Sequence, residues 1–227
     1  VGYQKYIDIN SFIDYYIINE FVRNVDAYRF STYMYKDRSS NGGKIIMGPI
    51  WDYNLAYGNI NYSIGASAQG WTNGHLSWFN RLLEDSVFAN KLRCRWEYLR
   101  HRSFNQDSIY NFIDSMTFYI EEAQQRNFQR WDILGNYVWP NYYVGSTFND
   151  EIGYLKDWIE ERLVWIDDNL PGSCNNITGL YNFYGLNNDR KLISITDMLG
   201  RETKFKLNTP LIYIYNDGTV EKKIFFK

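Results

Sequence analysis

The sequence has few residues of the kinds that build disulfide scaffolds, metal centres or membrane spans. Its 227 residues include two cysteines, Cys94 and Cys174, and two histidines, His75 and His101. Two cysteines are too few for a disulfide scaffold and fit no zinc-binding pattern. The histidines lie far apart in the sequence, which favours polar surface or core positions over metal ligation. No apolar run approaches the roughly 18 residues of a membrane-spanning helix, so we expect no membrane span.

The sequence also lacks a large charge of either sign. The formal net charge is −2, and basic residues form no continuous stripe. We therefore expect no nucleic-acid partner, because binding to phosphates depends on clustered lysine and arginine. Aromatic residues, in contrast, make up 19% of the chain and include 21 tyrosines. Many of them share helical spacing with other apolar residues, which favours packing, and a sugar-binding face is the alternative.

The N-terminal part predicts a helix followed by a β-hairpin. Apolar residues recur at helical spacing over residues 12–22, and Asn10 is placed to cap that helix. Residues that favour strands fill 30–35, and a second such run follows at 44–47. The glycine-containing stretch 38–43 separates the two runs, which are expected to pair as a hairpin.

The middle of the chain predicts helices. It begins with a polar loop at residues 59–73, whose length is typical of a functional loop. Helical stripes follow over residues 76–99, 109–123 and 152–166. Asp85 is placed to start a new helix within the first stripe, and Thr147 with Asp150 forms a capping box before the last.

The pattern changes after Cys174. Helical periodicity ends, and short β runs appear at residues 191–196, 211–215 and 220–226. Asp217-Gly218 is a strong hairpin-turn signal between the last two runs. We therefore predict an α+β protein, with a mainly helical domain that carries a β-hairpin at residues 1–171 and a small antiparallel β module at residues 172–227.

Two aspartates flank the predicted N-terminal hairpin. Asp26 follows the first helix, and Asp52 follows the second strand. Phosphoryl transfer needs one carboxylate to orient the attacking hydroxyl and another to hold the magnesium ion at the nucleotide phosphates. Protein kinases place these carboxylates in this order on two loops beside a short hairpin, so we expect Asp26 and Asp52 to point into one cleft. Turn formation and helix capping are the alternative roles of two such aspartates.

Short sequence words around the two aspartates resemble the CotH kinase family, which is named after a spore coat protein. The words are NEF at 19–21, NVDAYR at 24–29, TYMY at 32–35 and GPIWDYNLAYG at 48–58. The last word contains the most specific piece, Pro-x-Trp-Asp-Tyr-x-Leu-Ala-x-Gly. The resemblance runs from about residue 3 to residue 170, and it implies a kinase-like C-lobe and phosphorylation of protein Ser or Thr hydroxyls.

The resemblance also implies a role for each residue of the site. Asp26 would be the catalytic carboxylate, and Asp52 would bind Mg²⁺, with ATP as the phosphate donor. Asn54 on the same loop would help to shape the phosphate end of the site. Kinases grip the phosphates through a Lys–Glu pair of an N-terminal lobe, which we expect to lie outside this chain. We therefore expect this chain alone to be inactive.

Two positions depart from the family pattern. An Asn commonly stands five positions after the catalytic Asp and supports a second metal ion, and Ser31, with its weaker hydroxyl ligand, occupies that position here. Position 54 is Asn where the family often has Asp, which removes a negative charge from the metal end. A pseudokinase that binds a nucleotide or a protein without transfer is therefore the alternative function. Glu20 is expected to be structural and to pair with a nearby arginine such as Arg23 or Arg29.

Two words near the C-terminus resemble the sorting domain of the type IX (Por) secretion system of Bacteroidota. They are LGR at 199–201 and DGTVEKK at 217–223, within a resemblance over about residues 180–227. The resemblance implies a secreted or cell-surface protein with the type IX machinery as a partner, and a generic β tail is the alternative. Export and the many aromatic residues also leave open a secreted glycan- or protein-binding module without catalysis.

Export makes a disulfide chemically permissible. Cys94 lies in a predicted helix of the main domain, and Cys174 lies just after its last helix. We expect the two cysteines to form a disulfide that pins the domain boundary to the core. In a cytosolic protein they would be buried thiols.

Overall fold

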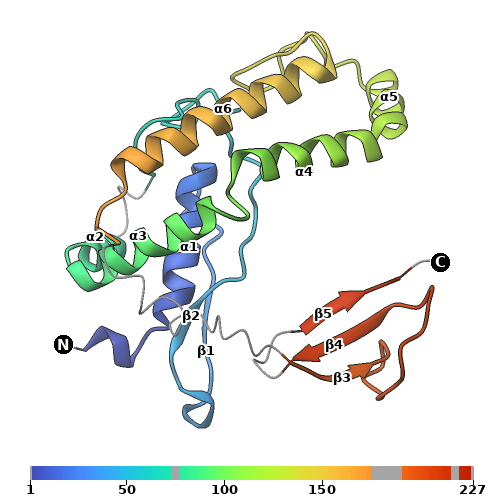
Figure 1. Ribbon diagram of the computed structural model, residues 1–227. Helices are drawn as coiled ribbons and strands as arrows, with labels where there is room; N and C mark the ends of the chain where they lie inside the picture. Colours follow the sequence, from blue (N-terminus) through green and yellow to red (C-terminus); the bar gives the residue numbers. More distant parts are fainter. Residues whose placement is uncertain (1, 73–76, 175–190, 216–219, 226–227) are drawn as a thin grey trace. The chain divides into compact units, whose positions relative to one another are not determined.

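The computed structural model describes residues 2–72, 77–174, 191–215 and 220–225. The chain divides into two compact units, Val1–Cys174 and Asn175–Lys227. Helices dominate the first unit, and a three-stranded antiparallel sheet forms the second (Figure 1). The protein is therefore α+β, as the sequence predicts.

Helices and one β-hairpin build the described part of the first unit. In chain order these elements are α1 (Ile9–Val22), β1 (Met34–Lys36), β2 (Ile45–Met47), α2 (Ser77–Leu83), α3 (Ser86–Arg100), α4 (Gln106–Tyr119), α5 (Glu121–Arg130) and α6 (Phe148–Asn169). Short 3-10 helices add Tyr3–Lys5 and Ser39–Asn41. Among the described residues, no helix combines the length and the apolar character needed to cross a membrane.

The helix α1 lies at the centre of the first unit because it is apolar on most of its faces. Nine of its 14 residues are buried, and α3, α6 and β2 pack around it. The carboxylate of Asp8 caps this helix by accepting a hydrogen bond from the Ser11 N–H at 2.8 Å. The sequence-based expectation of an Asn10 cap is wrong, because the helix begins one residue before Asn10.

The β-hairpin is fixed to the start of α1. Its strands pair Met34 with Met47 and Lys36 with Ile45. The N–H of Asp8 donates to the Ile45 carbonyl at 2.8 Å. The first strand is shorter than predicted, since residues 30–33 form part of a loop. The hairpin therefore carries the chain from the Asp26 region to the Asp52 region along one edge of α1.

An aromatic cluster forms the core beside the first half of α1. Its members are Phe12, Tyr15, Tyr16, Tyr28 and Phe79, whose paired ring centroids lie 5.1–6.3 Å apart. Aromatic rings at such spacings contribute packing energy beyond their buried area. Tyr28 belongs to the loop of Asp26, so the cluster anchors that loop to the core.

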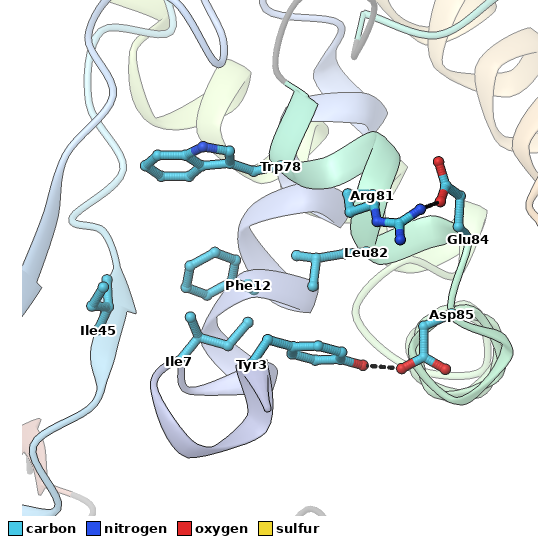
Figure 2. Close-up of a pocket in the computed structure, with 9 residues that line it drawn as sticks. All are labelled: Tyr3, Ile7, Phe12, Ile45, Trp78, Arg81, Leu82, Glu84 and Asp85. Carbon is cyan, nitrogen blue, oxygen red and sulfur yellow. Dashed lines mark hydrogen bonds and ion pairs between the residues drawn. The ribbon is translucent and has the colours of Figure 1, made fainter. Parts of the chain in front are cut away.

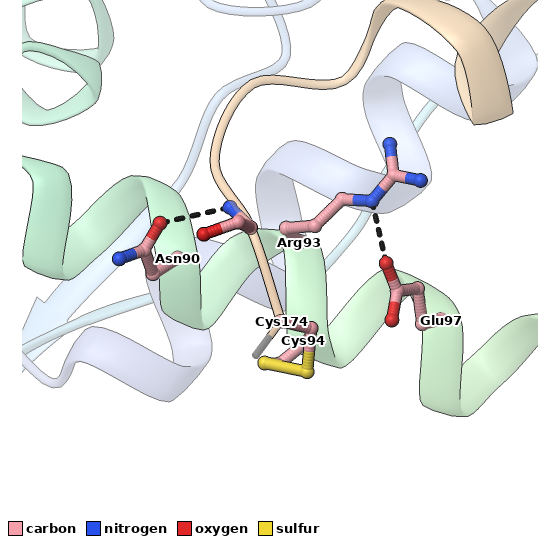
Figure 3. The surroundings of a disulfide bond; sticks show 6 residues. Asn90, Arg93, Cys94, Glu97 and Cys174 are labelled. Carbon is pink, nitrogen blue, oxygen red and sulfur yellow. Dashed lines mark hydrogen bonds and ion pairs between the residues drawn. A yellow bond between two sulfur atoms is a disulfide. The ribbon is translucent and has the colours of Figure 1, made fainter. Parts of the chain in front are cut away.

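A disulfide joins Cys94 on α3 to Cys174, which follows α6 (Figure 3). The Cα atoms lie 4.8 Å apart, and 80 residues separate the two cysteines in sequence. Beside it, the N–H of Ser173 donates to the Asn90 side chain at 2.8 Å. The disulfide expected from the sequence is therefore present, and it fastens the end of the first unit to α3.

The second unit is an antiparallel sheet of β3 (Leu192–Thr196), β4 (Leu211–Tyr215) and β5 (Val220–Lys223), with β4 in the middle. The register pairs Ile195 with Tyr213 and Tyr213 with Glu221. Leu211 and Tyr213 alternate with more exposed residues on β4, as expected for a sheet with one buried face. The predicted turn at Asp217-Gly218 lies outside the described residues.

Candidate functional site

Two loops of the first unit lie side by side, one after α1 at residues 23–31 and one after β2 at residues 48–57. The Val25 N–H of the first loop donates to the Leu55 carbonyl of the second at 3.3 Å. The Tyr57 N–H of the second loop donates to the carbonyl of Val22, the last residue of α1, at 2.8 Å. The structure thus brings together two segments that the hairpin separates in sequence.

Asn24 connects the backbones of the two aspartates. Its side-chain NH₂ donates to the carbonyl of Asp52 at 3.4 Å, and its Oδ1 accepts from the N–H of Asp26 at 3.1 Å. The side chain is buried, with 2% of its residue surface exposed. Sequence reasoning did not single out Asn24, although its place two residues before Asp26 is typical of a side chain that bonds the backbone two residues on.

Asp52 and Ser31 are in direct contact. The Ser31 hydroxyl donates to Oδ2 of Asp52 at 3.0 Å, and both side chains belong to the solvent-exposed part of the loops. The two residues expected to ligate metal therefore present three oxygen atoms at one place. Asn54 is exposed on the same loop.

Asp26 is half-buried and is held through its backbone. Its carbonyl accepts hydrogen bonds from the N–H groups of Phe30 at 2.8 Å and Arg29 at 3.3 Å. Its carboxylate accepts no hydrogen bond from the described residues. The contacts join the loop of Asp26, rather than its carboxylate, to Asp52, and the expectation that both carboxylates point into one cleft stays a prediction.

Left-handed backbone conformations concentrate in these two loops. Five residues with side chains have positive φ there: Arg23 at 53°, Tyr28 at 66°, Ser31 at 47°, Asp52 at 63° and Tyr57 at 56°. Such conformations are uncommon outside glycine and cost free energy, so they persist where the surrounding structure holds them, often at functional sites. Two of the five are the contacting pair Ser31 and Asp52.

A buried ion pair packs beneath the loop of Asp26, on the side that faces the core, and holds it through Tyr28. Glu20 accepts hydrogen bonds from the Tyr28 hydroxyl at 3.0 Å and from the Thr72 N–H at 2.8 Å, and it pairs with Arg162 at 3.6 Å. Burial raises the pKa of Tyr28 well above its ordinary value, and the nearby Glu20 charge adds to the rise. The expected structural role of Glu20 fits these contacts, but its ion pair here is with Arg162, which the sequence places 142 residues away.

A large cavity lies elsewhere in the first unit. It measures about 940 Å³ and is lined mainly by apolar side chains, with the Tyr3 hydroxyl bonded to Asp85 at its edge (Figure 2). A smaller cavity of about 370 Å³ borders the start of the 48–57 loop at Gly48–Ile50. Neither cavity includes Asp26 or Asp52. We place the candidate chemistry on the loops, because the contacting oxygen atoms of Ser31 and Asp52 and the strained backbone lie there.

No cluster of three or more His, Cys, Asp or Glu side chains suited to a metal ion occurs within the described ranges. The oxygen-only donor set of Ser31 and Asp52 is nevertheless of the kind that Mg²⁺ accepts, since this ion is often held by one or two carboxylates together with phosphates and water. These residues therefore fit a magnesium ion that arrives with a nucleotide, and they do not fit a cage built by the protein alone.

A comparison with protein families gives one match. A family described as CotH kinase protein matches residues 1–166 of the 227. The match includes α1, the hairpin, both aspartate loops and most of α6. No curated protein matches the chain.

Proposed function

The chain belongs to the CotH kinase protein family, and we propose that it is an atypical protein kinase that transfers phosphate from ATP to protein Ser or Thr hydroxyls with Mg²⁺. The observation that supports this most directly is the contact of Ser31 with Asp52 on a loop bonded to the loop of Asp26. The order of the parts, with a carboxylate, a hairpin and a second carboxylate, is the one that kinases use.

Asp26 is proposed to orient the attacking hydroxyl. Its carboxylate makes no hydrogen bond to the described residues, so it is available to accept one from a substrate Ser or Thr. Its backbone is bonded at both the N–H and the carbonyl, by Asn24 and by Arg29 and Phe30. A carboxylate on a fixed backbone reduces the loss of freedom on reaching the reactive geometry.

Asp52 and Ser31 are proposed to hold Mg²⁺ through a carboxylate and a hydroxyl oxygen. When bound, the ion would neutralise charge on the nucleotide phosphates during transfer. Asn54 is proposed to contact the phosphates through its amide. The hydroxyl at position 31 is a weaker neutral ligand than the amide of the family pattern, and the amide at position 54 lacks the charge of the Asp often found there. Binding without transfer is therefore the alternative outcome.

Labelled-phosphate transfer and Mg-ATP binding by the full-length protein test this proposal. We expect Asp26→Asn to reduce transfer by at least about 10³-fold while nucleotide binding is retained. Asp52→Asn is expected to abolish Mg-dependent binding, because it removes the charged metal ligand. Ser31→Asn is expected to raise transfer, since an amide carbonyl is the stronger neutral ligand. Asp132→Asn, at an exposed position, is the matched control.

Three outcomes separate the alternatives. Binding of Mg-ATP without transfer would identify a pseudokinase. The absence of both binding and transfer would contradict the nucleotide site altogether. Transfer that survives both aspartate substitutions would show that the chemistry lies on other residues.

We also propose that residues 172–227 form a sorting module and that the protein is secreted or displayed at the cell surface through the type IX machinery. The β3–β4–β5 sheet, in a unit separate from the helical one, supports this proposal. Deletion of residues 175–227 in the producing cells, which keeps Cys174 and the disulfide, is expected to leave the protein in the periplasm. Unchanged export after deletion would contradict the sorting role.

A second candidate function is glycan binding by an exposed aromatic surface of the first unit. Tyr62 and Trp139 stack with ring centroids 5.9 Å apart and 10° between their planes, and 69% of Trp139 is exposed. Asn61 fixes the surrounding loops by donating to the Pro140 carbonyl at 2.8 Å and to the Tyr137 hydroxyl at 2.6 Å. Exposed, fixed aromatic rings suit stacking on the C–H face of a sugar.

Retention on immobilised polysaccharides tests this second function. Trp139→Ala is expected to abolish retention, and Trp131→Ala, which removes another exposed tryptophan, is the control. Asp26→Asn is expected to leave retention unchanged, so the assay separates this surface from the proposed kinase site. Equal retention of the wild type and Trp139→Ala would rule the surface out.

A further inference from the structure

The segment at residues 64–72 follows the Asp52 loop in the chain and precedes α2. It contains no helix or strand, so its backbone carbonyls need partners from elsewhere when they are shielded from water. Side chains of α6 and of the end of α1 provide them. Arg23 donates to the carbonyls of Ile64 and Ser67. Trp158 donates to the carbonyl of Ala66, and Arg162 donates to those of Ala68 and Gly70. The Thr72 N–H donates to Glu20.

Arg162 connects this segment to α1. Its Nη1 donates to the carbonyls of Ala68 and Gly70, both at 2.8 Å, and its Nε and Nη2 donate to the Glu20 carbonyl at 2.9 and 2.6 Å. None of its side chain is exposed. Burial lowers the pKa of Arg162 to about 10, against the opposing effect of Glu20, so the guanidinium is still charged at neutral pH.

Arg23 makes the second connection, from the position where α1 ends and the loop of Asp26 begins. It is the left-handed C-cap of α1, with φ of 53°. Its Nη1 donates to the Ile64 and Ser67 carbonyls at 2.7 and 2.5 Å. Gly70 packs against the same guanidinium, because a Cβ added there would lie 2.9 Å from Nη2 of Arg23. The residue that introduces the Asp26 loop thus also holds the segment.

We propose that Arg23 and Arg162 are positioning residues that keep segment 64–72 ordered for the protein substrate, so that phosphate transfer does not depend on phosphorylation of this segment. The proposal rests on the proposed kinase function. In many protein kinases, the loop after the metal-binding Asp is ordered when arginines pair with a phosphorylated residue. Here both guanidinium groups already bond backbone carbonyls, which are present in every state of the protein.

The test uses the full-length protein with Arg162→Lys and Gly70→Ala. Arg162→Lys retains the charge but cannot reproduce the four bonds of the guanidinium fork. Gly70→Ala crowds Nη2 of Arg23 and also strains the backbone of the segment, because Gly70 has φ of 88°. It leaves the buried charges in place. Either change is expected to speed hydrogen exchange in residues 64–72 and to lower kcat/KM for a protein substrate by about 10²-fold. Mg-ATP affinity is expected to stay unchanged, which a general loss of structure would not allow.

Two matched controls complete the experiment. Arg126→Lys alters an exposed arginine that pairs with Glu122 on α5 and is expected to change neither measurement. The double substitution Ser63→Ala and Ser67→Ala removes two exposed hydroxyls in and beside the segment. It is expected to retain full transfer activity, and phosphatase treatment of the wild type is expected to have no effect.

The outcomes separate this proposal from the proposed function. If the wild type transfers phosphate but Arg162→Lys and Gly70→Ala change neither exchange nor kcat/KM, the positioning role is wrong and the kinase function stands. Loss of transfer on phosphatase treatment, or in the double serine variant, would also overturn it. If the wild type transfers no phosphate, the proposed function fails and this proposal fails with it.

Discussion

The two units are stabilised by different means. The first buries an ion pair, Glu20 with Arg162, between α1 and α6 and adds a disulfide. In the described part of the second unit, the buried hydrophobic side chains are Leu211 and Tyr213. Its ion pairs, such as that of Arg201 with Asp197, are at least partly exposed. The first unit therefore adds buried long-range polar contacts and a disulfide to its hydrophobic core, whereas strand pairing dominates the described part of the second.

The two units also differ in how many residues have a left-handed backbone conformation. Six of the seven left-handed residues with side chains in the described ranges belong to the first unit, and five of them lie in the two aspartate loops. The exception in the second unit is Asn208, a residue type that adopts this conformation readily. Strain of this kind is retained only where packing determines the backbone strongly. The region with the buried charge network is also the region that holds the candidate site.

Removing the disulfide is the largest expected test of this contrast. The double substitution Cys94→Ala and Cys174→Ala opens a loop of 80 residues and is expected to lower the free energy of unfolding of the first unit by about 4–5 kcal/mol. All eight tryptophans lie between residues 51 and 165, so tryptophan fluorescence in a denaturant titration follows the first unit. A shift of the sheet transition by a similar amount would show that the units do not unfold independently.

Breaking the buried ion pair is expected to have the next largest effect. Glu20→Gln keeps the shape of the side chain but leaves the Arg162 charge unpaired, which costs about 3–5 kcal/mol when one partner of a buried pair is lost. The measurement is again the fluorescence transition. Glu20→Gln combined with Arg162→Met is expected to cost less than the sum of the single changes, because no lone charge remains. Additive costs would mean that the pair is not coupled.

Leu211→Ala tests the second unit. Leu211 is 1% exposed in the middle strand, and its truncation is expected to lower the stability of the sheet by about 2–5 kcal/mol. Far-ultraviolet circular dichroism should show an earlier loss of β signal, with the tryptophan transition unchanged. Ile193→Ala, at an exposed position of β3, is the control. A destabilised tryptophan transition in Leu211→Ala would contradict the separation of the two units.

The sequence predicts features that depend on neighbouring residues. The capping box of Thr147 and Asp150 is present at the start of α6, and Asp85 caps α3 through the Val87 N–H. The hairpin is also found, because turn residues leave clear local patterns. For the same reason, the family resemblance around Asp26 and Asp52 is recognisable in short stretches of sequence. The disulfide is long-range, and it could be predicted because the sequence offers only two cysteines.

The contacts that position the candidate site could not be predicted in this way. The partners Glu20 and Arg162 are 142 residues apart, and no periodicity links a glutamate near the end of one helix to an arginine in the last. The bonds from Arg23 to the carbonyls of Ile64 and Ser67 involve backbone atoms, which every residue type offers. Side-chain identity therefore carries little information about them.

The smallest expected effect comes from Asp85, the cap of α3, and Asp197, which accepts backbone hydrogen bonds within a turn after β3. The pH dependence of stability at these two sites compares the units. The hydrogen bond from Tyr3, together with that from the Val87 N–H, lowers the pKa of Asp85 in the first unit. The backbone N–H of Arg201, followed by its side chain, lowers the pKa of Asp197 in the second. A carboxylate whose pKa falls on folding stabilises the fold above its unfolded pKa of about 3.9, and that stabilisation disappears as pH falls through the folded pKa. Both groups are accessible to solvent, so screening keeps the effects small.

The stabilisation by each carboxylate is measured by thermal unfolding of Asp85→Asn and Asp197→Asn at pH 7 and at pH 2.5. At pH 7, Asp85→Asn is expected to lower the midpoint of the tryptophan transition and Asp197→Asn that of the sheet transition. At pH 2.5 each variant should lie closer to the wild type than at pH 7, because protonation progressively removes the advantage of the carboxylate as the pH falls. A difference that persists at low pH would assign the effect to the neutral hydrogen bonds of the cap or turn, and a pH-dependent effect of Asp197→Asn on the tryptophan signal would show that the sheet supports the helical unit.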